Sequence, residues 1–269
     1  MDTMIKELFN LDGKVAIITG GAGLLGTEYA TVLGAAGAAV AFLDIRSPSA
    51  MRRHAAALRR RSLRPVLGLR VDITKEREVR TAVGEIMRRF KRIDILINNA
   101  ALTDISGGGD RFSRYEKFPD ELFQRELEVT LTGAFRVTKA ALPAMMRRRR
   151  GVIVNISSIY GVSGPDNRIY PRGRYRSLGY ATAKSGILNF TRALASYLAP
   201  HGIRVNTLTL GGVCSGQDRK FLRAYGARAM LGRMARAEEV RGPMLFLCSD
   251  ASSYMTGANL IVDGGWTAW

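Results

Sequence analysis

The chain has 269 residues, of which 46% are hydrophobic and 24% charged. This composition excludes a disordered protein, and the length suits one α/β domain with a large core. The two cysteines, Cys214 and Cys248, fit no disulfide framework and no metal or redox spacing, so we expect no metal and a reducing, cytoplasmic compartment. The N-terminal sequence lacks an apolar signal region and no run reaches membrane-spanning length, which predicts no membrane partner.

The formal net charge of +18 makes a nucleic-acid partner one hypothesis. Arginine clusters at residues 52–53, 59–61 and 147–150 contribute much of this charge. The first two fall in the predicted second helix and the third ends a later helix, where arginine is typical of a solvated face. No recognition motif for DNA or RNA accompanies them, so we expect no specific nucleic-acid partner.

Short apolar runs alternate with helix-length segments along the whole chain. The runs predict strands at residues 15–19, 39–43, 66–71, 93–97, 152–156, 204–208 and 260–262. Helical segments lie between them, for example at residues 76–90, 120–146 and 180–198. Regular alternation of this kind indicates an α/β fold with a doubly wound, seven-stranded parallel sheet of the Rossmann type. No linker divides the chain, so residues 1–269 are interpreted as one domain.

The first strand is followed by a glycine turn, TGGAGLLG, at residues 19–26. Gly21, Gly23 and Gly26 match the G-x-G-x-x-G pattern between a strand and a helix. Glycine permits a tight turn and close approach of a pyrophosphate, and the helix N-terminus supplies N–H groups and positive charge. The alternative is an ordinary tight turn, but its place in the chain favours a dinucleotide site.

Asp44 ends the second predicted strand. A carboxylate at this position can accept hydrogen bonds from the ribose hydroxyls of NAD and would repel the 2′-phosphate of NADP. Arg46 follows closely and could accommodate a phosphate. The sequence therefore favours NAD over NADP, with a simple strand-end turn residue as the alternative interpretation of Asp44.

Further motifs follow in a fixed order: VDIT at residues 71–74, NNAA at 98–101, GVIVNISS at 151–158, Tyr180-x-x-x-Lys184, and SDASSYMTGANLIVDGG at 249–265. Together they resemble the short-chain dehydrogenase/reductase family in its single-domain form, over about residues 10–267. The resemblance implies an NAD(P)-dependent oxidoreductase of alcohols and carbonyls. The cofactor residues that we expect from the turn and from this resemblance are Gly20, Gly23, Leu25, Gly26, Asp44, Ile45, Asp72, Ile73, Asn99, Ala100, Tyr180, Lys184, Val213 and Ser215.

The chain has only two histidines, so the tyrosine and lysine must be considered for proton transfer. Tyrosine has an ordinary pKa near 10, and a nearby cation lowers it by stabilising the phenolate. Lys184 lies four residues after Tyr180, on the same face of a helix. The pair can thus serve as general acid/base, and by resemblance Ser158 binds the substrate oxygen.

The sequence departs from the family pattern in the glycine turn and in the proton relay. Leu24 stands where the turn usually has a glycine. Thr130 stands where the family usually has a catalytic asparagine that holds a relay water, so we include Thr130 among the catalytic residues but expect a relay that is altered or slower. Because of this change, a redox-inactive dinucleotide-binding sensor or scaffold is one alternative function. If Arg46 outweighs Asp44, an NADPH-dependent reductase of 3-oxoacyl type is another.

The connection between Ser158 and Tyr180 is longer than is usual in the family and is rich in Gly, Pro and Arg. We predict substrate loops at residues 159–178 and 212–233. Arg168 and Arg174 in the first loop are expected to bind an anionic group, because arginine matches carboxylate and phosphate geometry; a solvated loop or a subunit contact is the alternative. The expected substrate is a small polar alcohol or carbonyl, such as a sugar or sugar acid. The resemblance also implies a homodimer or homotetramer.

Overall fold

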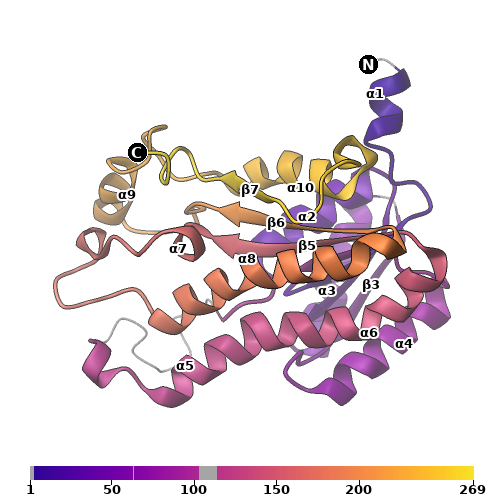
Figure 1. The fold of residues 1–269 in the computed structure, drawn as a ribbon, viewed down its shortest axis with the longest axis horizontal. Coiled ribbons are helices and arrows are strands. Elements are labelled where there is room, and N and C mark those ends of the chain that lie inside the picture. The colour runs from indigo at the N-terminus through magenta and orange to yellow at the C-terminus, as the bar shows by residue number, and fades with distance from the viewer. Residues whose placement is uncertain (1–2, 63, 103–113) are drawn as a thin grey trace.

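The computed structural model describes residues 3–62, 64–102 and 114–269. Seven parallel strands form one sheet in the order β3-β2-β1-β4-β5-β6-β7 (Figure 1). The strands are β1 (Val15–Thr19), β2 (Ala39–Asp44), β3 (Val66–Arg70), β4 (Ile95–Asn98), β5 (Gly151–Ser158), β6 (Ile203–Leu210) and β7 (Asn259–Val262). The predicted fold class and strands are confirmed, with ends that differ by a few residues.

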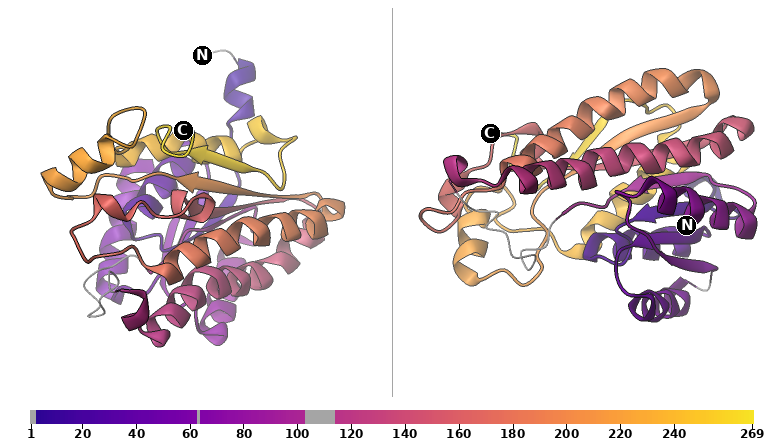
Figure 2. Two further views of the ribbon diagram at one scale, coloured as in Figure 1. Left: turned by 60° about the vertical axis from the view of Figure 1, so that its left-hand side comes forward. Right: turned by 90° about the horizontal axis from the view of Figure 1, so that it is seen from below.

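Helices cover both faces of this sheet (Figures 1 and 2). The longer ones are α2 (Leu24–Ala35), α3 (Pro48–Ser62), α4 (Glu76–Phe90), α6 (Gly133–Arg148) and α8 (Leu178–Leu198). The shorter ones are α1 (Thr3–Leu8), α5 (Asp120–Leu127), α7 (Ile159–Val162), α9 (Arg219–Gly226) and α10 (Arg241–Cys248). Single 3₁₀ turns occur at Tyr115–Lys117, Asn167–Ile169, Ala199–His201, Ala237–Val240 and Asp250–Ser252.

Two apolar layers form because the strands are buried on both faces. Ala16 and Ile18 of β1 pack in the layer under α2, α3 and α10, while Val15 and Ile17 pack in the layer under α4, α6 and α8. This alternation explains why residues 15–18 are all apolar, since a strand covered on both sides needs no polar face.

One predicted helix differs from the structure. The segment 120–146 was expected to be continuous, but it consists of α5, a π-helical turn at Glu128–Thr132, and α6. A π turn inserts a residue into the helical repeat and is often found at functional sites. Here it carries Thr130 and lies in contact with α8.

The centre of the sheet holds a buried polar ladder. Asn98 donates to the side chains of Asn155 (2.8 Å) and Thr138 (3.0 Å), and Asn155 donates to Thr191 (2.9 Å). Buried polar groups need such partners. The ladder connects β4 and β5 to α6 and α8. Of these two helices, α8 carries Tyr180.

Candidate active site

A cavity of about 1320 Å³ opens at the carboxyl ends of the strands. In a parallel sheet the strand order reverses beside the first strand, here between β1 and β4, and ligands bind at such a switch point. The cavity is lined by residues from the glycine turn, from the ends of β2 to β6, from α5 and α8, and from both predicted substrate loops. All the expected cofactor residues except Gly26 line it.

Gly20 begins the turn with φ of +61°, a left-handed conformation that L side chains rarely adopt. The hydroxyl of Thr19 accepts hydrogen bonds from the backbone N–H groups of Asn99 and Ala100, both at 3.0 Å. The Asn99 side chain donates to the carbonyls of Thr19 (2.9 Å) and Gly20 (3.2 Å). These contacts hold the glycine turn and the end of β4 together as one wall.

Gly26 lies beneath the turn, where a Cβ would meet Gly20 O at 2.4 Å and Gly21 Cα at 2.6 Å. Gly23 is the N-cap of α2, whose first turn therefore faces the cavity with free N–H groups. Leu24 is the first residue of α2 and is partly exposed. Since this position is helical, it requires no glycine, which explains the departure from the usual pattern.

Asp44 lies at the end of β2 beside this turn. One carboxylate oxygen accepts from Ala22 N–H (3.1 Å) and the other from Arg46 N–H (3.3 Å). The side chain of Asp44 is partly exposed and lines the cavity next to Ile45 and Arg46. The carboxylate is thus fixed by backbone donors and still accessible to a ligand.

The other expected cofactor residues differ in burial: the turn at Asp72 and Ile73 is largely buried, whereas Ser215 is exposed. Asp72 closes a turn by accepting from the N–H (2.9 Å) and hydroxyl (2.7 Å) of Thr74, and Ile73 is buried beside it. Ser215 is exposed, and its N–H and hydroxyl both bind the side chain of Gln217. The fixed glycine cradle, the exposed carboxylate and the size of the cavity fit a dinucleotide.

Tyr180, Lys184 and Ser158 lie close together in the lining of the cavity. Ser177 is the N-cap of α8, accepting from Tyr180 N–H (3.3 Å), and its hydroxyl donates to the buried Glu126 in a short hydrogen bond. Ser158 ends β5 and hydrogen-bonds the Tyr180 phenol. The sequence predicted this grouping, and the structure brings all three side chains to one place.

The electrostatic environment of Tyr180 favours its ionised form. Burial acts to raise its pKa, but the charges of Lys184 and Arg176 and the hydrogen bond from Ser158 outweigh burial, so its pKa lies below the ordinary value. Burial lowers the pKa of Lys184. The Lys184 ammonium donates to the carbonyl of Ile156 (2.7 Å) and lies 5.7 Å from the Tyr180 ring centroid.

Thr130 lies in the π turn and does not line the cavity. Its side chain is buried, and its hydroxyl has no hydrogen-bond partner among the described residues. A buried hydroxyl without a protein partner is costly unless water or a ligand satisfies it. Its neighbours Glu128 and Val129 do line the cavity.

The two predicted anion-binding arginines occupy different places. Arg174 lines the cavity. Arg168 does not: its side chain is 81% exposed and its guanidinium binds Asp166 at 2.8 Å and 2.9 Å. The 3₁₀ turn at Asn167–Ile169 thus directs Arg168 to its own loop neighbour and not to the cavity, and its contact with substrate stays a prediction.

Residues 212–233 form a cover over the cavity that is attached to the C-terminal tail. Gly212 N–H donates to the Tyr225 hydroxyl at 2.5 Å, and Tyr225 stacks on Trp266 with ring centroids 4.3 Å apart. Leu231 N–H donates to Gly264 O (3.0 Å). Asp166 also binds Arg228 (3.1 Å), which links the two predicted substrate loops.

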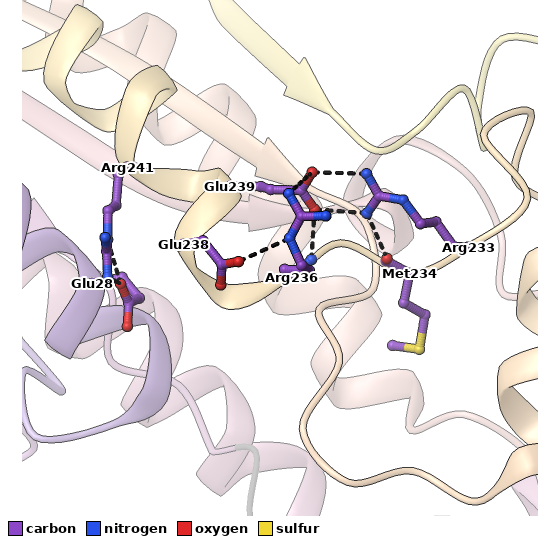
Figure 3. Close-up of polar contacts among 7 residues, drawn as sticks. All are labelled: Glu28, Arg233, Met234, Arg236, Glu238, Glu239 and Arg241. Atoms are coloured by element: carbon purple, nitrogen blue, oxygen red, sulfur yellow. Dashed lines mark hydrogen bonds and ion pairs between the residues drawn. The ribbon is translucent and has the colours of Figure 1, made fainter.

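The end of this cover is fixed by a group of charged residues (Figure 3). Arg233 binds both carboxylate oxygens of Glu239 (2.7 Å and 2.8 Å) and donates to the carbonyl of Met234, a cavity residue. Arg236 binds Glu238 (2.8 Å). Hydrogen bonds from Arg233 and from Arg236 N–H lower the pKa of Glu239 to about 2.

Sequence reasoning missed several cavity residues. Arg125 and Gln124 reach the cavity from α5. Tyr170 reaches it from the long connection at residues 159–178, called the insert below, and Phe221 and Tyr225 reach it from the cover. Arg176 reaches the cavity from the same connection as Tyr170. The periodicity of α5 and α9 could not show which face meets a cavity formed by distant segments.

Among the described residues, no group of three His, Cys, Asp or Glu side chains could hold a metal ion, and no helix is long and apolar enough to cross a membrane.

Comparisons with known proteins agree on one family. Residues 21–267 match the family model described as Enoyl-(Acyl carrier protein) reductase. The trans-4-hydroxycyclohexanecarboxylate dehydrogenase of Sinomonas cyclohexanicum is 38% identical over 261 residues, which are 95% of this chain and 93% of that protein.

Solved structures give the same result. A gluconate 5-dehydrogenase from Burkholderia cenocepacia J2315, in complex with NADP and tartrate, is 28% identical with a TM-score of 0.87, covering 98% of this chain and 99% of that one. An NAD⁺-bound xylitol dehydrogenase is 30% identical with a TM-score of 0.83, covering 94% and 99%. The chain thus belongs to the short-chain dehydrogenase/reductase family and is a nicotinamide-dependent oxidoreductase of alcohols.

Proposed function

We propose that this protein interconverts a small polar alcohol and its carbonyl with NAD(H), using Tyr180 as general acid/base. The observation that carries the proposal is the meeting of Ser158, Tyr180 and Lys184 in the same cavity as the glycine turn. The residues that would hold the dinucleotide are Gly20, Gly23, Leu25, Asp44, Ile45, Asp72, Ile73, Asn99, Ala100, Lys184, Val213 and Ser215, with Gly26 shaping the turn from beneath.

The protein's part in the reaction is to place the substrate and move one proton. Ser158 and Tyr180 bind the substrate oxygen from two sides, and Lys184 stabilises the phenolate. In oxidation, the Tyr180 phenolate takes the alcohol proton; in reduction, the phenol returns it. The nicotinamide, when bound, supplies the hydride acceptor or donor. We include Thr130 as a relay residue, because its buried hydroxyl is available to a water molecule.

We propose NAD rather than NADP because the Asp44 carboxylate is fixed by two backbone donors and faces the cavity. A 2′-phosphate next to it would meet a like charge. Arg46 is exposed at the same rim, and it supports NADPH-dependent reduction as the second candidate.

For the substrate we propose a hydroxy acid or a related polyol. The cavity lining includes Arg125 and Arg174, which suit a carboxylate. The related hydroxycyclohexanecarboxylate and gluconate dehydrogenases are named for substrates of this kind.

One experiment tests cofactor and chemistry together. Fluorescence titration with NADH and NADPH is run on the protein and on Asp44→Ala, followed by a turnover screen of cyclic hydroxy acids, sugar acids and polyols. We expect tighter NADH binding, a preference that Asp44→Ala reduces or reverses, and turnover that Tyr180→Phe abolishes. Binding without any turnover would support the sensor alternative, and NADPH preference in the unaltered protein would support the reductase.

We further propose that the protein forms a homodimer or homotetramer through α6 and α8. These helices lie side by side (Figure 2), and the side chains of Phe135 and Tyr197 are 50% and 63% exposed on them. Phe190 and Leu131 line a groove next to Phe135. Sedimentation of a Phe135→Arg variant should show a smaller species; an unchanged mass would refute this interface.

Both cysteines are free, which supports a reducing compartment such as the cytoplasm. The arginine clusters at residues 52–53, 59–61 and 147–150 are exposed, as solvated faces would be. We propose no specific nucleic-acid partner.

A further inference from the structure

Arg176 lies immediately before α8, and its guanidinium packs against the ring of Tyr180. The guanidinium carbon is 4.2 Å from the Tyr180 ring centroid and 5.7 Å from that of Tyr160. At 4.2 Å the contact has the geometry of a cation–π stack. Because Lys184 lies 5.7 Å from the same centroid, two cationic side chains lie beside one tyrosine.

The backbone of Arg176 is fixed by the long connection between β5 and α8. Its N–H donates to the side chain of Asn167 at 2.9 Å, and Asn167 begins the 3₁₀ turn of the insert. The next residue, Ser177, caps α8 and hydrogen-bonds Glu126 on α5. The insert thus holds Arg176 at a set place relative to Tyr180.

The neighbours of this second charge, besides Tyr180, are one carboxylate and two further tyrosines. The carboxylate is that of Glu126, which acts on Arg176 less strongly than the three tyrosines do and accepts the hydrogen bond from Ser177. Tyr160 on α7 and Tyr170 in the insert hydrogen-bond each other (2.9 Å), and burial raises the pKa of both, so both are neutral. The Nε of Arg176 is buried and has no hydrogen-bond partner among the described residues.

We propose that Arg176 is a positioning residue for Tyr180: its guanidinium, stacked on the ring, adds a second positive charge to that of Lys184 and favours the phenolate. This inference rests on the proposed role of Tyr180 as the proton-transfer residue. It assigns a purpose to the insert, which brings a second cation to the catalytic tyrosine.

The sign of the pH effect follows from the reaction. Burial acts to raise the pKa of Tyr180, and Lys184 and Arg176 together lower it. Alcohol oxidation requires the phenolate, so kcat/KM rises as pH passes the midpoint of Tyr180. Removing the charge of Arg176 moves that midpoint to higher pH, while the rate at high pH approaches that of the unaltered protein.

The kinetic test compares Arg176→Gln, Arg176→Met and Arg176→Lys with Arg172→Gln, a matched arginine change in the same loop, exposed and outside the cavity. We expect the two neutral variants to shift the rising limb to higher pH, and Arg176→Lys, which keeps the positive charge, to leave the limb near its original position. An unmoved limb in a folded neutral variant overturns the proposal. A raised KM with an unmoved limb also overturns it, because Arg176 would then bind substrate.

A second measurement needs no substrate and separates this proposal from the enzyme's function. The near-ultraviolet absorbance of tyrosinate is titrated with pH for each protein and for the same protein carrying Tyr180→Phe, and the difference isolates Tyr180. We expect this midpoint to rise in Arg176→Met and Arg176→Gln and to stay near the original in Arg176→Lys. Equal midpoints in all variants refute the inference even if the protein turns over a substrate.

Discussion

Replacing Gly26 with alanine should disrupt the cofactor turn, because the structure leaves no room for a methyl group there. The new Cβ would lie 2.4 Å from Gly20 O, 2.6 Å from Gly21 Cα and 2.9 Å from Gly21 C. All three are backbone atoms of the turn, so no flexible side chain can move aside. To reach an ordinary contact of about 3.4 Å, the turn and α2 must separate by about 1 Å.

Gly26→Ala should lower the free energy of unfolding by an amount typical of overpacked sites in other proteins. Inserting a methyl group into a filled space costs about 1–3 kcal/mol. For a domain of this size each kcal/mol lowers Tm by roughly 2–4 °C. Because Gly20 lines the cavity and would move, NADH and NADPH binding should weaken by about tenfold or more, which corresponds to about 1.4 kcal/mol.

Gly84→Ala is the matched control. Gly84 lies inside α4, and a Cβ there would meet nothing within 4 Å. Alanine in a helix interior is favoured over glycine by about 0.5–1 kcal/mol, so this variant should melt higher and bind the dinucleotide unchanged. The two variants are compared by thermal melting and by fluorescence titration. If Gly26→Ala melts and binds like the unaltered protein, the close packing described for the turn is wrong.

Three further predictions concern the sheet, the relay and pH. Asn155→Ala should lower the unfolding free energy by about 1–3 kcal/mol in denaturant melts, since it removes one hydrogen bond each from the buried side chains of Asn98 on β4 and Thr191 on α8; a loss below about 1 kcal/mol would contradict the ladder's importance. Thr130→Val should leave Tm nearly unchanged but lower kcat, because it removes only a hydroxyl without a partner among the described residues; an unchanged kcat would exclude a relay role. Glu239 has a depressed pKa of about 2 against an ordinary 4.5, so its stabilising contribution is present above pH 4.5 and disappears as pH falls toward 2. The Tm of Glu239→Gln should therefore lie below that of the unaltered protein at neutral pH and converge with it in acid, and a constant gap would refute the assignment.

Hydrophobic patterning along the chain is sufficient to predict the architecture and the order of the motifs. Apolar runs such as VAIIT specify strands buried on both faces, and their alternation with amphipathic helices leaves a parallel sheet as the arrangement that buries both. Parallel strands carry the segments that follow them to one edge of the sheet, and the cavity at that edge is lined by the glycine turn, Asp44 and Ser158. Tyr180 and Lys184 could be paired from spacing alone, since four residues make one helical turn.

Contacts between distant segments select which loop arginine meets Tyr180. Arg168, Arg174 and Arg176 are equivalent in composition, but hydrogen bonds to Asp166 and Asn167 send the first to solvent and fix the last on Tyr180. The π turn at Glu128–Thr132 likewise could not be predicted from local sequence, because its residues are compatible with an ordinary α-helix. In the structure this turn packs against α8. Local patterns specify which element a residue joins, whereas the direction of a side chain in a loop depends on partners far apart in the chain.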